Sequence, residues 1–373
     1  MLEKLEHKRR VKKYKYKYKY KSKKKKFPPF KINFLLLSCF LVIFIILYFV
    51  IFRKIKIPFK RTKKREVFFF DQKEEELNYC KKYGILIYNY SYYSPNAREI
   101  NIGDYIQSLA ALQFLPKNCI PKLIDRDSFQ LYQGENTTLI MNGWYNLIYK
   151  NKKVPDNISP IYLSVHILNV NRLDSITINN LKKYQPIGCR DLYTLNGLRK
   201  YGIDAYFSSC LTTTLDIDYL INDKERTNEI IFIDYNFGYD IRIDNYIKSL
   251  KSYNFSNITH THHMFKLNIS LFERFKTARN LIEKYAKAKL VITTRLHGAL
   301  PCLALHTPFI FVNKHFDMRF DGLYQFLNTV GINKTNQFNI NVKFDNNNFV
   351  INPNTYLDYS NKLKEYLKRI MSL

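Results

Sequence analysis

Cysteine and glycine are scarce in this 373-residue sequence, which has six of the first and 11 of the second. No two cysteines form a Cys-x-x-Cys pair, so zinc and thioredoxin chemistry have no support. No metal-ligand cluster and no glycine-rich nucleotide loop is visible, and we expect neither a metal nor a cofactor. Cys39 lies in an apolar run, and the other five cysteines are an odd number, so any disulfide scheme leaves one thiol free.

Acidic residues are also scarce, with 31 Asp+Glu against 60 Lys+Arg and a net charge of +29. Such an excess first suggests nucleic acid or an anionic membrane. However, residues 1–66 hold 23 basic and 3 acidic residues, which leaves 37 and 28 beyond them, a net of +9. Because the rest of the chain is only mildly basic, we expect no nucleic-acid partner, although an anionic small ligand fits.

The N-terminal segment predicts a membrane anchor. Residues 1–31 form a low-complexity basic tail that cannot bury a core and is expected to be disordered. Residues 32–52 then form 21 positions without a charge, enough to cross a hydrocarbon core of about 30 Å. The long preceding segment and the lack of a small-x-small cleavage site favour a transmembrane helix over a signal peptide. Residues 53–78 are interpreted as a stem.

The orientation of this anchor is less clear. Fifteen basic residues precede the span and eight lie in residues 53–66, which tips the positive-inside rule toward a cytoplasmic N-terminus. Seven Asn-x-Ser/Thr sequons beyond the span fit a glycosylated lumenal or extracytoplasmic domain, although several are expected by chance in an Asn-rich chain.

Beyond residue 78, strand-like and helix-like patterns alternate twice, with a break near 216–228. This alternation predicts parallel α/β sheets. We expect two Rossmann-like domains, at 79–220 and 221–373, that face each other across a cleft. Ligands in such sheets bind beyond the carboxyl ends of the strands. Residues 320–331 are expected to be helical.

The stretch "VITTRLHGALPCLAL" (291–305) is the first candidate site, because a buried strand changes there into a helix. A helix start favours an anion, and Arg295 adds a bidentate cation for phosphate or carboxylate. His297 titrates near neutrality and is a candidate acid or base, and Gly298 lets a ligand approach the backbone. The alternative is a packing arginine and a helix-capping histidine.

Two further turns carry candidate residues. In "NIGD" (101–104), Asn101, Gly103 and Asp104 precede a helix and are either its N-cap or part of the site, with Asp104 as a base. In "GCRD" (188–191), Arg190 ends a short strand and is either half of an arginine clamp with Arg295 or a surface partner of Asp191.

These stretches, together with "DMRFDGL" (317–323), resemble the polysaccharide pyruvyl transferase family from about residue 84 to 330. The resemblance implies a fold similar to B-type glycosyltransferases. It also implies transfer of the enolpyruvyl group of phosphoenolpyruvate to hydroxyls of a glycan as a ketal, with release of phosphate. Some relatives have Ser-Gly-Cys where this chain has Ser208-Ser209-Cys210.

The resemblance assigns donor contacts to Arg295, Leu296 and His297 of the "RLHG" turn, and to Arg190. We take His297 as the acid, Asp104 as a candidate base, and Arg319 as a lesser phosphate contact. One alternative is a membrane-anchored glycosyltransferase that uses a nucleotide sugar. Another is a non-catalytic, lectin-like protein that has kept the fold.

Overall fold

The computed structural model describes residues 78–89, 98–116, 119–146, 153–216, 218 and 225–371. The described residues belong to one compact unit, Glu66–Leu373. No helix within these ranges is long and apolar enough to cross a membrane. The predicted tail and anchor, and nearly all of the predicted stem, lie outside the described residues.

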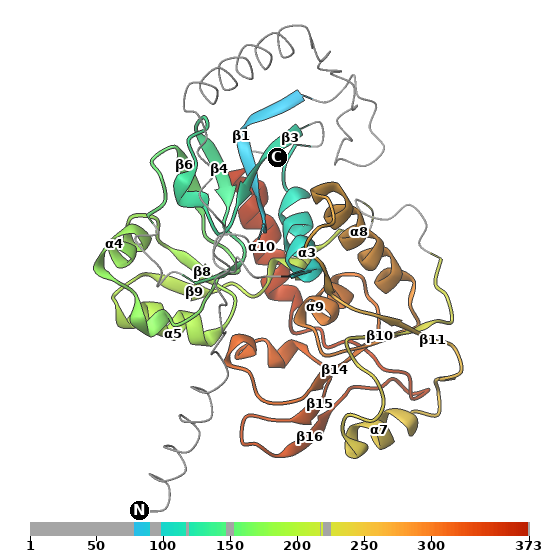
Figure 1. Ribbon diagram of the computed structural model, residues 1–373. Helices are drawn as coiled ribbons and strands as arrows, with labels where there is room; N and C mark the ends of the chain where they lie inside the picture. The colour runs from blue at the N-terminus through green and yellow to red at the C-terminus, as the bar shows by residue number, and fades with distance from the viewer. Residues whose placement is uncertain are drawn as a thin grey trace, which may run out of the picture. The chain divides into compact units, whose positions relative to one another are not determined.

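The fold is mixed α/β, with parallel sheets in both halves of the chain (Figure 1). The N-terminal sheet has the order β3-β1-β4-β6, and all its pairs are parallel. Its strands are β1 (Asn78–Ile87), β3 (Cys119–Asp125), β4 (Thr137–Ile140) and β6 (Ile158–Ile161). Two short parallel pairs continue this half: β5 (Trp144–Tyr145) with β7 (His166–Ile167), and β8 (Ile187–Cys189) with β9 (Ala205–Phe207).

The C-terminal sheet has the order β11-β10-β13-β14-β15-β16 and is parallel except for its last pair. Its strands are β10 (Ile230–Ile233), β11 (Ile258–Thr261), β13 (Leu290–Thr293), β14 (Phe309–Asn313), β15 (Thr329–Ile332) and β16 (Phe338–Asn341). Strands β10, β13 and β14 are buried along their whole length, which explains their unbroken apolar sequences.

Seven α-helices lie among the described residues. They are α3 (Ile102–Leu112), α4 (Ser175–Lys183), α5 (Leu192–Lys200), α7 (Ile241–Lys248), α8 (Leu271–Lys287), α9 (Leu296–Ala304) and α10 (Leu357–Ile370). Helix α3 is buried at every position, and it packs against α8 and α9 of the other half. The largest apolar core therefore contains residues of both halves. At about 1.5–3 kcal/mol for each fully buried large apolar side chain, these contacts join the halves firmly.

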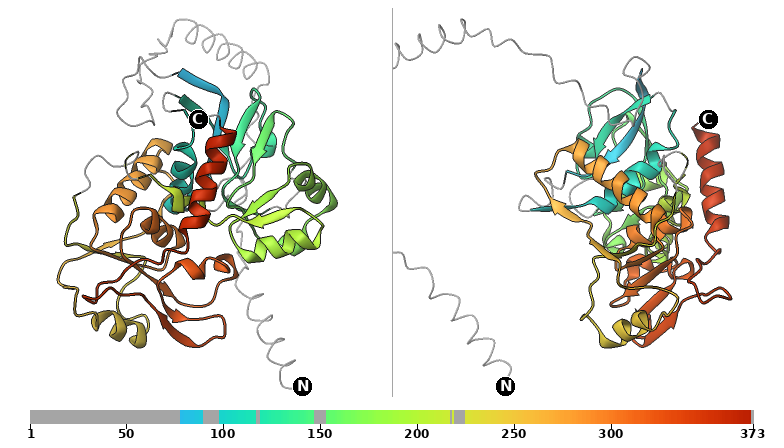
Figure 2. Two further views of the ribbon diagram at one scale, coloured as in Figure 1. Left: turned by 180° about the vertical axis from the view of Figure 1, so that it is seen from behind. Right: turned by 90° about the vertical axis from the view of Figure 1, so that its right-hand side faces the viewer.

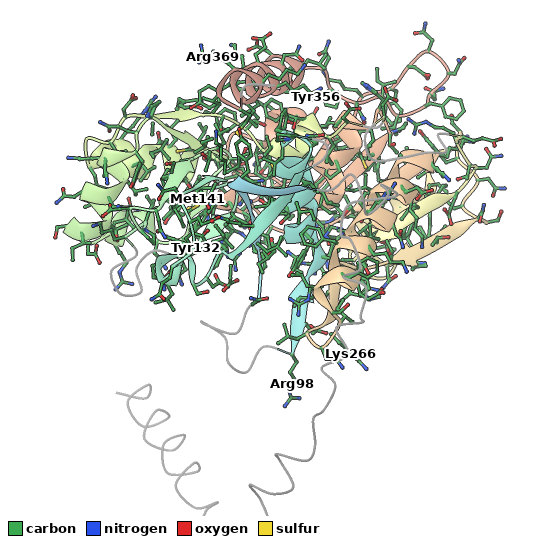
Figure 3. The ribbon with its side chains drawn as sticks, turned by 90° about the horizontal axis from the view of Figure 1, so that it is seen from above. Arg98, Tyr132, Met141, Lys266, Tyr356 and Arg369 are labelled. Atoms are coloured by element: carbon green, nitrogen blue, oxygen red, sulfur yellow. The ribbon has the colours of Figure 1, made fainter. Side chains whose placement is uncertain are left out.

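Two other connections tie the halves together. Strands β2 (Glu99–Asn101) and β12 (Met264–Lys266) form an antiparallel pair, and Figure 3 shows Arg98 and Lys266 close together at its end. Helix α10 returns to the N-terminal half, where Ser360 Oγ donates to Thr213 O at 2.9 Å. Figure 2 shows α10, in red, running from the C-terminal sheet toward the N-terminal strands. The elements that carry the candidate residues of the N-terminal half are thus held in a fixed arrangement with those of the C-terminal half.

The expected helix at residues 320–331 is wrong. This segment begins at the end of one 3-10 turn, Met318–Phe320, and contains a second, Tyr324–Phe326, followed by β15 (Thr329–Ile332). Two glycines with positive φ, Gly322 at +85° and Gly331 at +134°, explain the difference. Neither angle is compatible with a right-handed helix. The expected helix at 101–116 and the strand–helix transition at 289–306 are confirmed as α3 and as β13 with α9.

Candidate active site

The "RLHG" turn joins β13 to α9. Arg295 is the N-cap residue, and its backbone N–H donates to Thr293 Oγ1 at 2.9 Å. Leu296 begins the helix with its side chain in the core. Gly298 packs against the strand ends, because a Cβ there would lie 2.6 Å from Thr293 Oγ1 and 3.0 Å from Ile233 Cδ1. In this arrangement close helix–strand packing, rather than approach of a ligand, accounts for that glycine.

Arg295 is paired with a carboxylate that the sequence analysis did not identify. Its Nε donates to Asp234 Oδ2 at 2.6 Å, and 36% of its side chain is exposed. Asp234 follows β10, the neighbour of β13, and the backbone N–H of His263 also donates to its Oδ2. Arg190 and Arg295 each lie near a carboxylate of their own half of the chain, and the expected arginine clamp, which would act through a bound anion, stays a prediction.

The "NIGD" turn meets the "RLHG" turn. Asn101 caps α3 by accepting the Gly103 N–H at 3.0 Å. A Cβ on Gly103 would lie 2.9 Å from His263 Nδ1 and 3.2 Å from His297 Cβ. The two motifs are about 190 residues apart in sequence, and a glycine is needed where they touch.

Asp104 lies in the first turn of α3 and is 7% exposed. Gln107 Nε2 donates to its Oδ1 at 3.2 Å, and Arg126 Nη1 lies 3.7 Å from its Oδ2. Arg126 is also buried, and its guanidinium lies over the rings of Tyr88 and Trp144. Arg126 also donates through Nε and Nη2 to Asp127 at 2.9 and 3.1 Å, so Asp104 shares this cation with a second carboxylate.

Arg190 follows β8 and is 3% exposed. Its guanidinium forms no hydrogen bond within the described ranges, and its Nε lies 3.9 Å from Asp191 Oδ2. That carboxylate is already used, since it caps α5 through the Thr194 N–H and lies 2.7 Å from His166 Nδ1. A buried cation without good partners is costly, so Arg190 is suited to bind an anion.

His297 lies within reach of several cationic groups. Burial lowers its pKa well below the usual value, and the charges of Arg190, His263 and Arg319 lower it further. Its Nε2 is buried and has no partner among the described atoms. His297 is therefore neutral near pH 7 in the free protein, and only an added negative charge favours its protonation.

Arg319 is the most accessible of the candidate arginines. Its side chain is half-exposed, and it forms a bidentate pair with Asp317 through Nε and Nη2. The pKa of Arg319 is raised, first by this hydrogen bond to Asp317. Its charge acts on His297, although the carboxylate already neutralises much of it.

Several buried polar atoms near the strand ends of the N-terminal half have no partner among the described residues. They are Asn142 Oδ1, Trp144 Nε1, Ser164 Oγ, His166 Nε2 and Ser209 Oγ. Buried polar groups normally form hydrogen bonds, so such a group of exceptions is typical of a site that binds a polar ligand. Within the described part of the chain, no cluster of His, Cys, Asp and Glu is suited to a metal ion.

Four residues of this region were not predicted from the sequence: Arg126, His166, Asp234 and His263. A signal existed for Asp234, which directly follows the apolar run 230–233 as Thr294 and Arg295 follow the run 290–293. The others lie in segments without a motif, and only the fold brings them to the site.

Residues 101–315, more than half of the chain, match the polysaccharide pyruvyl transferase family. The crystal structure of a functional uncharacterized protein KP1_0663 from Klebsiella pneumoniae subsp. pneumoniae NTUH-K2044 is similar at 16% identity, with a TM-score of 0.39. That similarity covers 62% of this chain and 84% of the other. No curated protein matches. The matched segment holds "NIGD", "GCRD" and "RLHG", and the chain belongs to the polysaccharide pyruvyl transferase family.

Proposed function

We propose that the chain transfers the enolpyruvyl group of phosphoenolpyruvate to a glycan. Membership of the family makes it a transferase. The observation that carries the choice of donor is Arg190, a buried guanidinium without a hydrogen bond among the described residues. Phosphoenolpyruvate carries a phosphate and a carboxylate, and both are good bidentate partners for arginine.

The proposed reaction begins with protonation of the donor. His297 gives a proton to the methylene carbon, and C2 becomes an oxocarbenium-like centre. A glycan hydroxyl attacks C2 and loses its proton to a base, for which Asp104 is the candidate. The bond from C2 to the bridging oxygen then breaks and phosphate leaves with that electron pair. A second hydroxyl attacks C2 to close the ketal, and its proton goes to the departing phosphate.

The donor itself makes His297 a usable acid. Its pKa is low in the free protein because the ring is buried and because Arg190 and Arg319 are cationic. A bound phosphate and carboxylate offset these charges and raise the pKa of His297. Protonation is thus coupled to donor binding, which prevents an isolated imidazolium from being buried in the free protein.

We further propose a B-type glycosyltransferase arrangement for the two sheets. Two parallel sheets, with candidate residues after strands β8 and β13, support this proposal. The return of α10 to the N-terminal half is consistent with it.

We also propose that residues 32–52 anchor the chain in a membrane, with the enzyme on the lumenal or extracytoplasmic side. The uncharged 21-residue run and the sequons support this proposal. Asn136, Asn254, Asn257 and Asn268 are exposed, so their amides are accessible to a glycosylating enzyme.

Thermal unfolding of the full-length chain tests the donor. Phosphoenolpyruvate at 100 times its dissociation constant should stabilise the protein by about 2.7 kcal/mol, whereas UDP- and GDP-sugars should not. His297→Ala should abolish phosphate release while it keeps part of the donor binding. Stabilisation by a nucleotide sugar alone would support a glycosyltransferase, and normal turnover by His297→Ala would remove this residue from the mechanism.

A further inference from the structure

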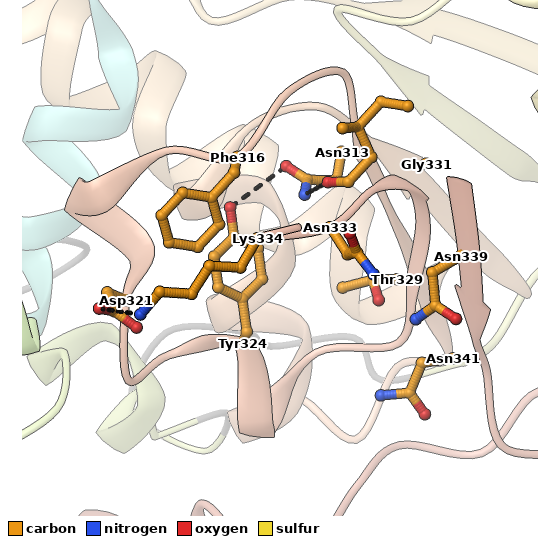
Figure 4. Close-up of a pocket in the computed structure, with 11 residues that line it drawn as sticks. Asn313, Phe316, Asp321, Tyr324, Thr329, Gly331, Asn333, Lys334, Asn339 and Asn341 are labelled. Atoms are coloured by element: carbon orange, nitrogen blue, oxygen red, sulfur yellow. Dashed lines mark hydrogen bonds and ion pairs between the residues drawn. The ribbon is translucent and has the colours of Figure 1, made fainter. Parts of the chain in front are cut away.

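A pocket of about 280 Å³ lies in the C-terminal half, beside β14, β15 and β16 (Figure 4). It is separate from the candidate catalytic residues, because none of Asp104, Arg190, Arg295 and His297 lines it. Its volume is near the lower end of the range for small-ligand sites, about 300–1,000 Å³.

Amide side chains dominate the wall of the pocket. Four asparagines line it, and Asn339 and Asn341 project from the same face of β16. In the β15–β16 ladder these two residues lie opposite Gly331 and Thr329. Asn339 and Asn341 are exposed, and neither side chain forms a hydrogen bond to another described residue. Each amide offers both a donor and an acceptor, as a sugar hydroxyl does.

The pocket presents no unbalanced charge. Its lysine, Lys334, donates to Asp321 Oδ2 at 3.2 Å. Phe316 stacks on Tyr324 with 5.4 Å between ring centroids, and Lys334 Nζ lies 5.5 Å from the centroid of the Phe316 ring. Because the cation is paired and the aromatic rings already have partners, neither a phosphate nor a nucleobase is the best ligand. A neutral, hydroxyl-rich molecule that forms hydrogen bonds with the amides fits the pocket better.

Hydrogen bonds link the wall of the pocket to Arg319, one of the candidate site residues. Tyr324 Oη donates to Asn313 Oδ1 at 3.3 Å and accepts from the Asp317 N–H at 3.2 Å. Asp317 in turn holds Arg319, whose charge acts on His297.

A second connection runs from the pocket to Arg190. Asp321, at the rim of the pocket, accepts the Leu192 N–H at 2.9 Å through its backbone carbonyl. Leu192 is the first residue of α5 and follows Arg190 by two positions. This bond fixes the rim of the pocket relative to the start of α5.

We propose that this pocket binds a neutral sugar unit of the acceptor, next to the unit that receives the pyruvyl group. The proposal rests on the proposed function and deepens it, because it assigns the acceptor glycan a subsite in the C-terminal half that is separate from the candidate donor-binding residues.

Binding of neutral hexose oligosaccharides to the purified full-length chain, without donor, tests this subsite. Saturation-transfer NMR detects the binding. Titrations with the oligosaccharides and with the matching monosaccharides give the difference between their affinities. The double variant Asn339→Ala/Asn341→Ala should weaken oligosaccharide binding about tenfold and change monosaccharide binding little. The matched control is Asn346→Ala, an exposed asparagine outside the pocket, which should bind as the unaltered chain does.

Two results would overturn the subsite: unchanged oligosaccharide affinity in the double variant, or no binding of any neutral oligosaccharide in the panel. Melting temperatures of all variants show whether they fold. Phosphoenolpyruvate binding by the same samples separates this test from that of the proposed function. If the donor fails to bind while the oligosaccharide binds through Asn339 and Asn341, only the donor assignment fails.

Discussion

Gly103 and His297 lie against each other, so that a Cβ at position 103 would approach His297 Cβ to 3.2 Å. This contact joins the helix start of α3 to the helix start of α9. The same Cβ would lie 2.9 Å from Nδ1 of His263, a ring that is fixed by a 2.8 Å hydrogen bond between its Nε2 and Tyr285 Oη. The position of His297 therefore depends on the absence of a side chain at residue 103.

Gly103→Ala should displace His297 and lower activity more than stability. Overpacking of a buried site costs about 1–3 kcal/mol, and a displaced acid loses its alignment with the donor. Gly143→Ala is the control, because its Cβ would meet no atom closer than 3.4 Å. Phosphate release and melting temperature measure the two effects. Equal activity in the two variants would show that the contact does not position His297.

Donor affinity should increase as the pH falls, because His297 takes up a proton with the donor. The pKa of His297 is well below its usual value in the free protein, and a bound anion raises it. The affinity therefore rises as the pH falls from the higher pKa of His297 in the complex to its lower pKa in the free protein. His297→Asn should lose this dependence when dissociation constants are measured across pH. Ionisation of the donor's phosphate, with a pKa of about 6, is common to both proteins, so their difference isolates the histidine. Identical pH profiles would contradict the coupling.

The core strands and the positions of the candidate residues could be predicted from the sequence. Runs such as Leu290–Thr293 are fully buried, and an unbroken apolar run shows this directly. Arg190 and Arg295 were placed correctly at strand ends, since parallel strands bring their carboxyl ends to one edge.

Other features could not be predicted, for two physical reasons. Residues 320–331 have apolar spacing that suits a helix, but a Cβ on Gly331 would lie 2.1 Å from Asn313 O, and only the folded sheet shows this. The ion pair of Arg295 with Asp234 joins residues 61 positions apart. Sequence position shows where a cation lies, but the fold decides whether it is already neutralised.

Replacement of Arg190 by methionine should separate binding from stability. Arg190→Met keeps most of the buried stem but removes a cation that forms no hydrogen bond among the described residues. The free energy of unfolding without ligand should stay the same or rise by about 1 kcal/mol. Donor binding should weaken roughly a hundredfold, which corresponds to about 3 kcal/mol for lost charged hydrogen bonds.

Arg172→Met is the matched control, because Arg172 is exposed in the same half of the chain. Arg172→Met should leave the free energy of unfolding and the donor affinity unchanged. Denaturant unfolding and donor titration measure them. A strong loss of stability in Arg190→Met without ligand would show that Arg190 serves the fold rather than an anion.

Ser209 adopts a backbone conformation that favours glycine. Its φ is +65°, its side chain is fully buried, and its Oγ has no partner among the described atoms. A non-glycine residue with this φ costs about 1–2 kcal/mol of backbone strain, which glycine would relieve. Glycine also loses more chain entropy on folding, which offsets about 0.5–1 kcal/mol of this gain. Ser209→Gly should therefore raise the free energy of unfolding by about 1 kcal/mol.

Ser209→Ala separates the two causes of this strain. Alanine removes the unpaired hydroxyl but keeps the Cβ, so it should gain less stability than glycine if φ is the main cost. The melting temperatures of the two variants, with an expected rise of roughly 2 °C for glycine, measure the order. If both variants are less stable than the unaltered chain, the hydroxyl contributes a contact that outweighs the strain. Because Ser209 follows β9 on the side of the sheet that carries Arg190, donor binding should be compared in the same samples.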